Sequence, residues 1–241
     1  MKPTTAIAHA PAYPHDAVQQ IADDVFVVRG SLLMNPLIRI SRNMAIVRHG
    51  GELSLINPIR LNDAGIGALQ GLGKIRRIVT LGAKHGLDDA WYREQFGVEC
   101  WARPGSRKYP PPADYRLLDE QQPLPIPDAQ LFCFHGTQPE SALLLRRGQG
   151  LLLTCDAIQH YGDYHHASPV AKLVLPFLGF SKTTLIGPIW LKAVTPAGGT
   201  LRGDFERLLQ LKFDSLFAAH GSFLPAGAHA AVEAAVRKAF G

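Results

Sequence analysis

The pattern of hydrophobic and polar positions along the chain switches repeatedly between a two-residue period and a helical period of about 3.6 residues. Short apolar or alternating runs predict strands at residues 24–30, 75–81, 98–102, 130–134, 142–146, 151–155 and 214–219. Residues 43–56 hold two more such runs, joined by Gly50 and Gly51, a pair typical of a β-hairpin turn. Helical spacing predicts helices at residues 62–72, with Asn62 as the N-cap, and at residues 88–96, 203–211 and 228–240. Groups of strands separated by helices predict an α/β protein whose sheet layers are flanked by helices.

The bulk composition is that of one globular domain. The chain has 241 residues, of which 46% are hydrophobic and 19% are charged, enough for a substantial core. Residues 1–15 carry three prolines and lack the apolar core of a signal peptide. We therefore expect a flexible N-terminal segment over residues 1–20 and a single domain over residues 21–241.

Charge and cysteine content limit the partners and the compartment. The net charge is +5, but the basic residues occur as scattered pairs such as Arg76 and Arg77, so we expect no nucleic-acid partner. The three cysteines, Cys100, Cys133 and Cys155, form no CxxC motif and cannot all be paired within the chain. This pattern favours reduced thiols in the cytoplasm over a disulfide framework.

Residues 169–191 are the one stretch with a membrane-like composition. Lys172 and Lys182 interrupt it and Pro176 and Pro188 break it, so we expect no membrane-spanning helix. We interpret the stretch as a half-buried excursion over the core that acts either as a lid or as a contact in a homodimer.

Three residues able to bind a metal ion follow predicted buried strands. His85 comes after strand 75–81, Asp156 directly after strand 151–155, and His220 directly after strand 214–219. Side chains at such positions can converge on one edge of a sheet, and imidazole and carboxylate groups are ligands for zinc-like ions. Asp89, four residues beyond His85, is a fourth candidate. Each residue also has a structural alternative: Asp156 can cap a turn, Asp89 can favour a helix N-terminus, and either histidine can bond a backbone carbonyl.

Four segments, in this order, resemble the metal-binding loops of the metallo-β-lactamase superfamily. They are KHGLDDAW (84–91), GTQPES (136–141), TCDAI (154–158) and AAHGS (218–222). The family patterns are His-x-His-x-Asp-His, Gly-His-Thr-Pro-Gly-Ser, a strand ending in Gly-Asp, and Gly-His-Gly. The resemblance runs from about residue 21 to the C-terminus, and it implies a four-layer αββα sandwich.

The chain departs from these patterns at named positions. Leu87, Ala90 and Thr137 stand where the resemblance would place metal-binding histidines. A second alignment, anchored on Thr80, would instead put His85 at the position of the family's aspartate. The chain resembles still more closely a divergent bacterial subgroup of undefined biochemistry, which shares a turn like NPIRL (57–61), a first loop with a single histidine and a closing AHG.

Other polar residues near these loops leave alternatives open. Glu140 replaces a glycine of the middle loop and could be a ligand, a general base or an exposed glutamate. His135 could fill the place of Thr137 through a slip of one residue. Three histidines in a loop rich in histidine and tyrosine could line the mouth of a pocket or bind metal adventitiously: His160, His165 and His166.

The leading hypothesis is therefore a metallo-hydrolase-like protein with a degenerate site. It would hold at most one divalent ion (zinc, iron or manganese) through His85, Asp89, Asp156 and His220, and hydrolyse a small ester or related small-molecule substrate. The resemblance, not the residues themselves, supplies this substrate class. The alternative is a catalytically inactive, metal-free binding protein on the same fold.

Overall fold

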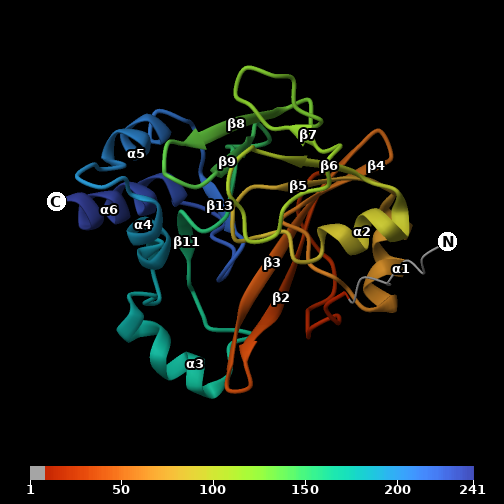
Figure 1. Ribbon diagram of the computed structural model, residues 1–241, viewed down its shortest axis with the longest axis horizontal. Coiled ribbons are helices and arrows are strands. Elements are labelled where there is room, and N and C mark those ends of the chain that lie inside the picture. Colours follow the sequence, from red (N-terminus) through yellow and green to blue (C-terminus); the bar gives the residue numbers. More distant parts are fainter. Residues whose placement is uncertain (1–8) are drawn as a thin grey trace.

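The chain folds into two sheets packed face to face between layers of helices, as the computed structural model, which describes residues 9–241, shows (Figure 1). The first sheet has seven strands in sequence order: β1 (Gln19–Ala22), β2 (Val25–Asn35), β3 (Ile38–His49), β4 (Glu52–Ile56), β5 (Lys74–Thr80), β6 (Glu99–Ala102) and β7 (Arg116–Leu117). The second has the order β13 (Ser215–Ala218), β10 (Leu151–Thr154), β9 (Glu140–Leu145) and β8 (Ala129–Phe134). A small third sheet pairs β11 (Ile158–His160) with β12 (Thr184–Ile186).

Helices cover the outer faces of both large sheets (Figure 1). The first sheet is covered by α1 (Asp63–Leu72) and α2 (Asp89–Phe96), and the second by α4 (Pro188–Val194), α5 (Arg202–Leu208) and α6 (Ala228–Phe240). A further helix, α3 (Pro169–Val174), continues into the 3₁₀ helix η1 (Leu175–Leu178).

Alternation along the strands explains why four layers form. On β3, Ala45 and Val47 belong to the core between the sheets, whereas Met44 and Ile46 belong to the core under α1 and α2. Successive side chains of a strand point to opposite faces, so a strand that is apolar at consecutive positions must be covered on both sides. The four-layer αββα sandwich predicted from the sequence is confirmed.

Local signals in the sequence act as expected. Gly50 and Gly51 have φ of 56° and 78° and connect β3 to β4, as a two-residue hairpin turn requires. The side chain of Asn62 accepts a hydrogen bond from the amide of Gly65 and caps α1. β2 and β3 extend beyond the runs predicted at 24–30 and 43–56 and form a hairpin that the sequence did not predict, because the side chains at its tip are exposed or half-buried and break the two-residue pattern.

The segment before β1 lies against the first sheet from the start of the described residues. The amide of Asp16 donates to the carbonyl of Arg29, Ser31 donates to the carbonyl of Pro14, and Arg60 donates to the carbonyl of Ala10. Of the segment 1–20 expected to be flexible, residues 1–8 lie outside the described residues, and residues 9–20 include these contacts.

The apolar stretch 169–191 forms α3, η1, β12 and the start of α4. Ser168, at the start of α3, donates its hydroxyl to the carbonyl of Leu37 and its amide to the carbonyl of Arg39, so α3 lies beside the tip of the β2–β3 hairpin (Figure 1). None of the described helices is long and apolar enough to span a membrane.

Candidate functional site

Two of the predicted ligands come from neighbouring parallel strands of the second sheet. Thr154 at the end of β10 pairs with Ala218 at the end of β13. Asp156 and His220 each lie two residues beyond these paired positions, so strand register places them side by side. His85 comes from the other sheet, in the turn between β5 and α2.

The three side chains meet at one carboxylate oxygen. Oδ1 of Asp156 lies 3.4 Å from Nε2 of His85 and 3.2 Å from Nε2 of His220. The two imidazole rings have centroids 5.2 Å apart. The side chains of His85, Asp156 and His220 are only 5%, 13% and 12% exposed. The structure thus brings together His85, Asp156 and His220.

Hydrogen bonds around His220 determine which nitrogen faces the carboxylate. Nδ1 of His220 lies 2.6 Å from the carbonyl oxygen of Ser41 and must donate to it, because a carbonyl only accepts. In the neutral imidazole, Nε2 then presents its lone pair toward Asp156. A lone pair and a carboxylate repel each other unless a cation, either a proton or a metal ion, lies between them. The amide of Gly221 donates to Ser41 Oγ, and Asn43 donates to the carbonyls of Ala218 and Gly221, which fixes this loop.

Glu140 fixes the backbone that carries Asp156. Its Oε1 accepts hydrogen bonds from the amides of Asp156 and Ala157, at 2.7 and 2.9 Å. The residue is 1% exposed, and burial raises the pKa of its carboxyl group well above the ordinary value, with Asp156 adding to the effect. The expectation of an exposed glutamate is therefore wrong, because Glu140 begins β9 and points into the protein beneath the site.

Asn57 joins the two sheets at the edge that carries the site. Its Oδ1 accepts from the amide of Leu81 after β5, and its Nδ2 donates to the carbonyl of Thr154 at the end of β10. The residue has φ of 50°, which asparagine tolerates better than most side chains. The sequence indicates Asn57 only as part of the NPIRL turn and does not predict this bridge.

Burial and neighbouring charges shift the pKa values of the central groups. Burial lowers the pKa of His85, although Asp156 partly opposes the shift, and this favours the neutral imidazole. Burial alone would raise the pKa of Asp156, but the neighbouring His85 and His220 outweigh it and hold that pKa well below the ordinary value. Among the described residues, ligand atoms of His85, Cys155 and Asp156 lie within 4.8 Å of one another. Burial raises the pKa of Cys155 well above the ordinary value, which keeps the thiol protonated and a poor ligand.

Asp89 is placed apart from this group. Its Oδ2 accepts a hydrogen bond of 2.6 Å from Thr80 Oγ1, and its Oδ1 is buried without a hydrogen-bond partner among the described residues. Burial raises the pKa of Asp89 to about 6. The preceding residue, Asp88, forms a buried ion pair of 2.6 Å with Arg42 and accepts from the amide of Arg60. This pair, which the sequence did not indicate, holds the start of α2 against β3.

The remaining candidates lie elsewhere. His135 bonds Asp204 of α5 through both its ring and its amide, so it does not fill the place of Thr137. Nδ1 of His160 lies 2.8 Å from Thr184 Oγ1. His165 and His166 each place Nε2 3.0 Å from Oδ1 of Asp16, which makes a second group of potential ligands on the surface.

The His85, Asp156 and His220 group opens into a pocket of about 440 Å³, a size typical of small-molecule sites. Its walls come from the β2–β3 hairpin, from α3 and η1, and from the start of α4. Leu87, which follows His85 by two residues, is one of the lining residues.

Two donor separations in this group suit a divalent ion. In a tetrahedral zinc site with bonds of 2.0–2.1 Å, neighbouring donor atoms are about 3.3 Å apart. The two separations at Asp156 Oδ1, 3.4 and 3.2 Å, are close to this value. Imidazole nitrogens and a carboxylate oxygen are also donors that zinc-like ions prefer.

Comparisons with solved structures identify the fold. The DIM-1 metallo-β-lactamase exposed to ceftazidime superposes with a TM-score of 0.61 at 10% identity, over 95% of this chain and 100% of that one. The FIM-1 metallo-β-lactamase from Pseudomonas aeruginosa in its mono-zinc form gives 0.62 at 15% identity, over 95% and 98%. A metallo-β-lactamase from Hirschia baltica gives 0.55 at 15% identity, over 93% and 97%. No family model and no curated protein matches the sequence. The chain therefore has the metallo-β-lactamase fold, as the sequence predicted, and at these identities the likeness shows the fold alone.

Proposed function

We propose that the chain is a metal-dependent hydrolase with one divalent ion held by His85, Asp156 and His220. The observation that carries the proposal is the approach of both Nε2 atoms to one oxygen of Asp156, with His220 oriented by the carbonyl of Ser41. A ligand histidine whose other ring nitrogen donates to a carbonyl is the usual arrangement in metal sites, because that bond fixes the tautomer.

Different residues would bind the ion, support its ligands and exclude water. A divalent ion bound there would polarise a carbonyl group and lower the pKa of a water molecule. Glu140 and Asn57 hold the backbone on which Asp156 stands, and Asn43 holds the loop of His220. The apolar walls of the pocket keep bulk water from the reacting group, which strengthens every electrostatic interaction there.

The proposal is for one ion rather than two. Leu87 and Thr137 offer no ligand where the family has histidines, and Asp89 bonds Thr80 instead. Three protein ligands and an open position are the usual arrangement of a catalytic zinc site. We extend the proposal to hydrolysis of a small ester or related substrate, a class that the family resemblance suggests and that three ligands with an open position would support.

Elemental analysis of the purified protein for zinc, iron and manganese tests the proposal. We expect about one ion per chain at the site and its loss in the His85→Ala/His220→Ala variant. Substoichiometric metal in the wild type, unchanged in that variant, would falsify the proposal.

A matched control is available within the chain. The second group of potential ligands can be removed in the His165→Ala/His166→Ala variant, which leaves the pocket untouched. This variant should retain the ion of the His85 site and any ester hydrolysis that the wild type shows. If metal content follows this variant instead, the ion belongs to the surface group and the hydrolase proposal fails.

The second candidate is a metal-free binding protein, in which a proton takes the place of the ion between Asp156 and the two histidines. The pocket and the lost histidine positions favour it. It predicts ligand binding that is unchanged by a chelator and no hydrolysis. In either case we propose a cytoplasmic protein with a small-molecule ligand and no nucleic-acid partner, since all three cysteines are free and buried.

A further inference from the structure

The walls of the pocket are apolar along most of their length. The β2–β3 hairpin contributes one wall and the α3, η1 and α4 region contributes the other. The apolar lining residues are Leu32, Met34, Ile38, Ile40, Leu87, Ala171, Val174, Leu175, Leu178, Phe180, Ile189 and Trp190. A cavity of about 440 Å³ lined in this way excludes a strongly hydrated substrate and favours an apolar chain.

Cationic side chains lie at the same end of the pocket as the His85 group. Lys84 precedes His85 directly, and the amide of Lys108 donates to the carbonyl of Ala83, which brings the second lysine to the same loop. Both lysines line the pocket, both are exposed, and neither has a salt-bridge partner within residues 9–241. The third cation there, Arg42, is already paired with Asp88. The pocket thus has an apolar arm and, beside the candidate metal ligands, two unpaired positive charges.

We propose that the substrate is an acyl ester or thioester with an apolar acyl chain and an anionic leaving group. The inference rests on the proposed hydrolase function, which it makes specific. The acyl chain lies between the hairpin and the α3–η1 region, the carbonyl carbon lies at the His85, Asp156 and His220 group, and the anion faces Lys84 and Lys108. Hydrolysis breaks the bond from the acyl carbon to oxygen or sulfur and forms a bond to the oxygen of water. One proton of that water goes to the leaving alcohol or thiol, and the other leaves the carboxylic acid product.

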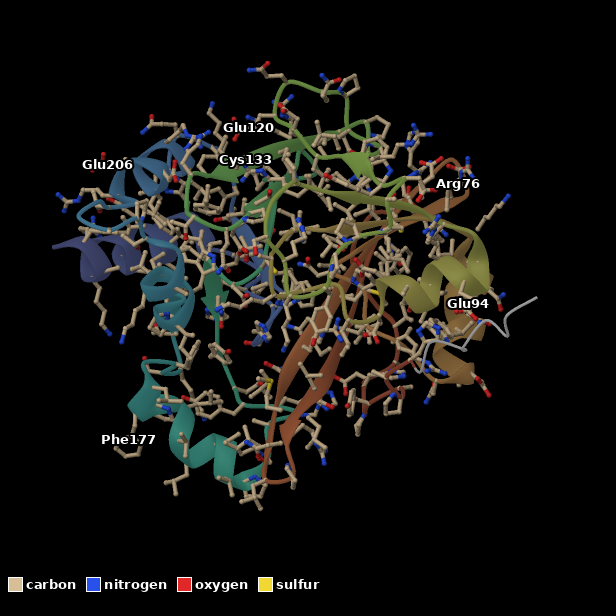
Figure 2. The ribbon with its side chains drawn as sticks, viewed as in Figure 1. Arg76, Glu94, Glu120, Cys133, Phe177 and Glu206 are labelled. Carbon is tan, nitrogen blue, oxygen red and sulfur yellow. The ribbon has the colours of Figure 1, made fainter. Side chains whose placement is uncertain are left out.

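The surface around the mouth of the pocket continues the apolar lining. Met34, Leu178 and Ile189 line the pocket and are also 55%, 50% and 53% exposed. Phe177, which is 85% exposed and does not line the pocket, lies at the outer edge of this region (Figure 2). A chain that fills the pocket can therefore extend across an apolar rim instead of ending in water.

The first experiment measures kcat/KM for a series of esters of 4-hydroxybenzoate from acetyl through butyryl and octanoyl to dodecanoyl. We expect a rise of about four-fold for each methylene group that enters the arm, followed by a plateau when the arm is full. A flat series, or a preference for the acetyl ester, would overturn the proposal.

Neighbouring variants on η1 separate the pocket from the rim. Leu178→Ser places a hydroxyl on the pocket wall and should lower kcat/KM for the octanoyl ester by about five-fold, leaving the acetyl ester unchanged. Phe177→Ser changes the more exposed neighbour and should leave both esters unchanged. Equal losses in the two variants would show that the chain does not lie in the pocket.

The charge prediction has its own matched substrates. Octanoyl esters of 4-hydroxybenzoate and of its methyl ester differ only in the negative charge on the leaving group. We expect the charged ester to be preferred by about two- to ten-fold at low salt, and the preference to disappear in Lys84→Ala/Lys108→Ala. If the preference persists in this variant, the two lysines do not bind the anionic leaving group and that part of the proposal is wrong.

Binding of the product separates this inference from the hydrolase proposal. Calorimetric titration of chelator-treated protein with octanoate and dodecanoate requires no metal and no turnover. Binding that tightens with chain length, without hydrolysis of any ester, would refute the enzyme and support the acyl pocket. Hydrolysis without any binding of octanoate or dodecanoate would support the enzyme and refute the acyl pocket.

Discussion

Replacing Asp89 by asparagine tests whether this carboxyl group is a buried acid or a metal ligand. In the structure, one carboxyl oxygen accepts from Thr80 and the other has no partner among the described residues. The charged groups that act on it are Arg42 and Arg107, which favour the ionised form, and Asp88, which opposes it. Burial outweighs both arginines. Asparagine keeps the shape and the oxygen that accepts from Thr80, but it cannot ionise.

The magnitude follows from the raised pKa. The pKa of Asp89 rises from the ordinary value of 3.8 to about 6 in the folded protein, so the folded state binds this proton more tightly than the unfolded state does. Stability from this group is fully present below the unfolded pKa and is lost as the pH rises through about 6. The full difference is about 3 kcal/mol, of which about 2 kcal/mol lies between about pH 4.5 and about pH 8. The asparagine side chain cannot ionise, so the Asp89→Asn variant does not lose this stability. Its free energy of unfolding relative to the wild type should therefore rise by about 2 kcal/mol between about pH 4.5 and about pH 8.

Urea denaturation of chelator-treated protein at both pH values measures this gain. Comparing the two pH values cancels any constant cost of the asparagine amide, since that cost does not depend on pH. Asp63→Asn is the control, because Asp63 also lies in the first turn of a helix but is exposed. If the Asp89→Asn and wild-type profiles run parallel, the reasoning about burial is wrong. Loss of bound metal in Asp89→Asn would instead restore the role that the sequence suggested for Asp89.

Two further predictions concern the residues that support the site. Glu140→Ala leaves the amides of Asp156 and Ala157 without their acceptor and should lower the free energy of unfolding by about 2–4 kcal/mol and weaken zinc binding, as urea denaturation and zinc titration would measure. Glu206→Ala, at an exposed position of α5 (Figure 2), should change neither, and equal effects of the two variants would count against the argument. Asn57→Gly keeps the positive φ but removes both bonds between the sheets, so it should cost about 2–3 kcal/mol in the same denaturation assay. A glycine variant as stable as the wild type would show that the bridge contributes nothing.

The sequence predicted the parts of this molecule that depend on neighbours in the chain. The glycine pair at residues 50 and 51, the cap at Asn62 and the apolar strands are local signals, and the structure confirms them. The positions of His85, Asp156 and His220 could be predicted because each follows the end of a buried strand, where register and the edge of a sheet limit what the chain can do.

The contacts that support the site could not be predicted in this way. The carbonyl of Ser41 orients His220 from 179 residues away, and Asn57 reaches Thr154 across 97 residues. Such contacts depend on how the two sheets pack, which periodicity does not encode. Glu140 shows the same limit, because an acidic residue at the start of a strand is usually exposed and only the packed structure reveals the two amides that it satisfies.

The different origins of the three central side chains have a mechanical consequence. Asp156 and His220 directly follow hydrogen-bonded neighbouring strands, so the ladder between β10 and β13 constrains their spacing. His85 follows a strand of the opposite sheet, so its distance from them depends on how the sheets pack, both at the Asn57 bridge and in the apolar layer that contains Val79, Leu153 and Phe217. Small sliding of one layer over the other would therefore move one donor relative to a fixed pair. Metal affinity would then depend on the spacing of the two sheets, and core substitutions far from the pocket would change that affinity.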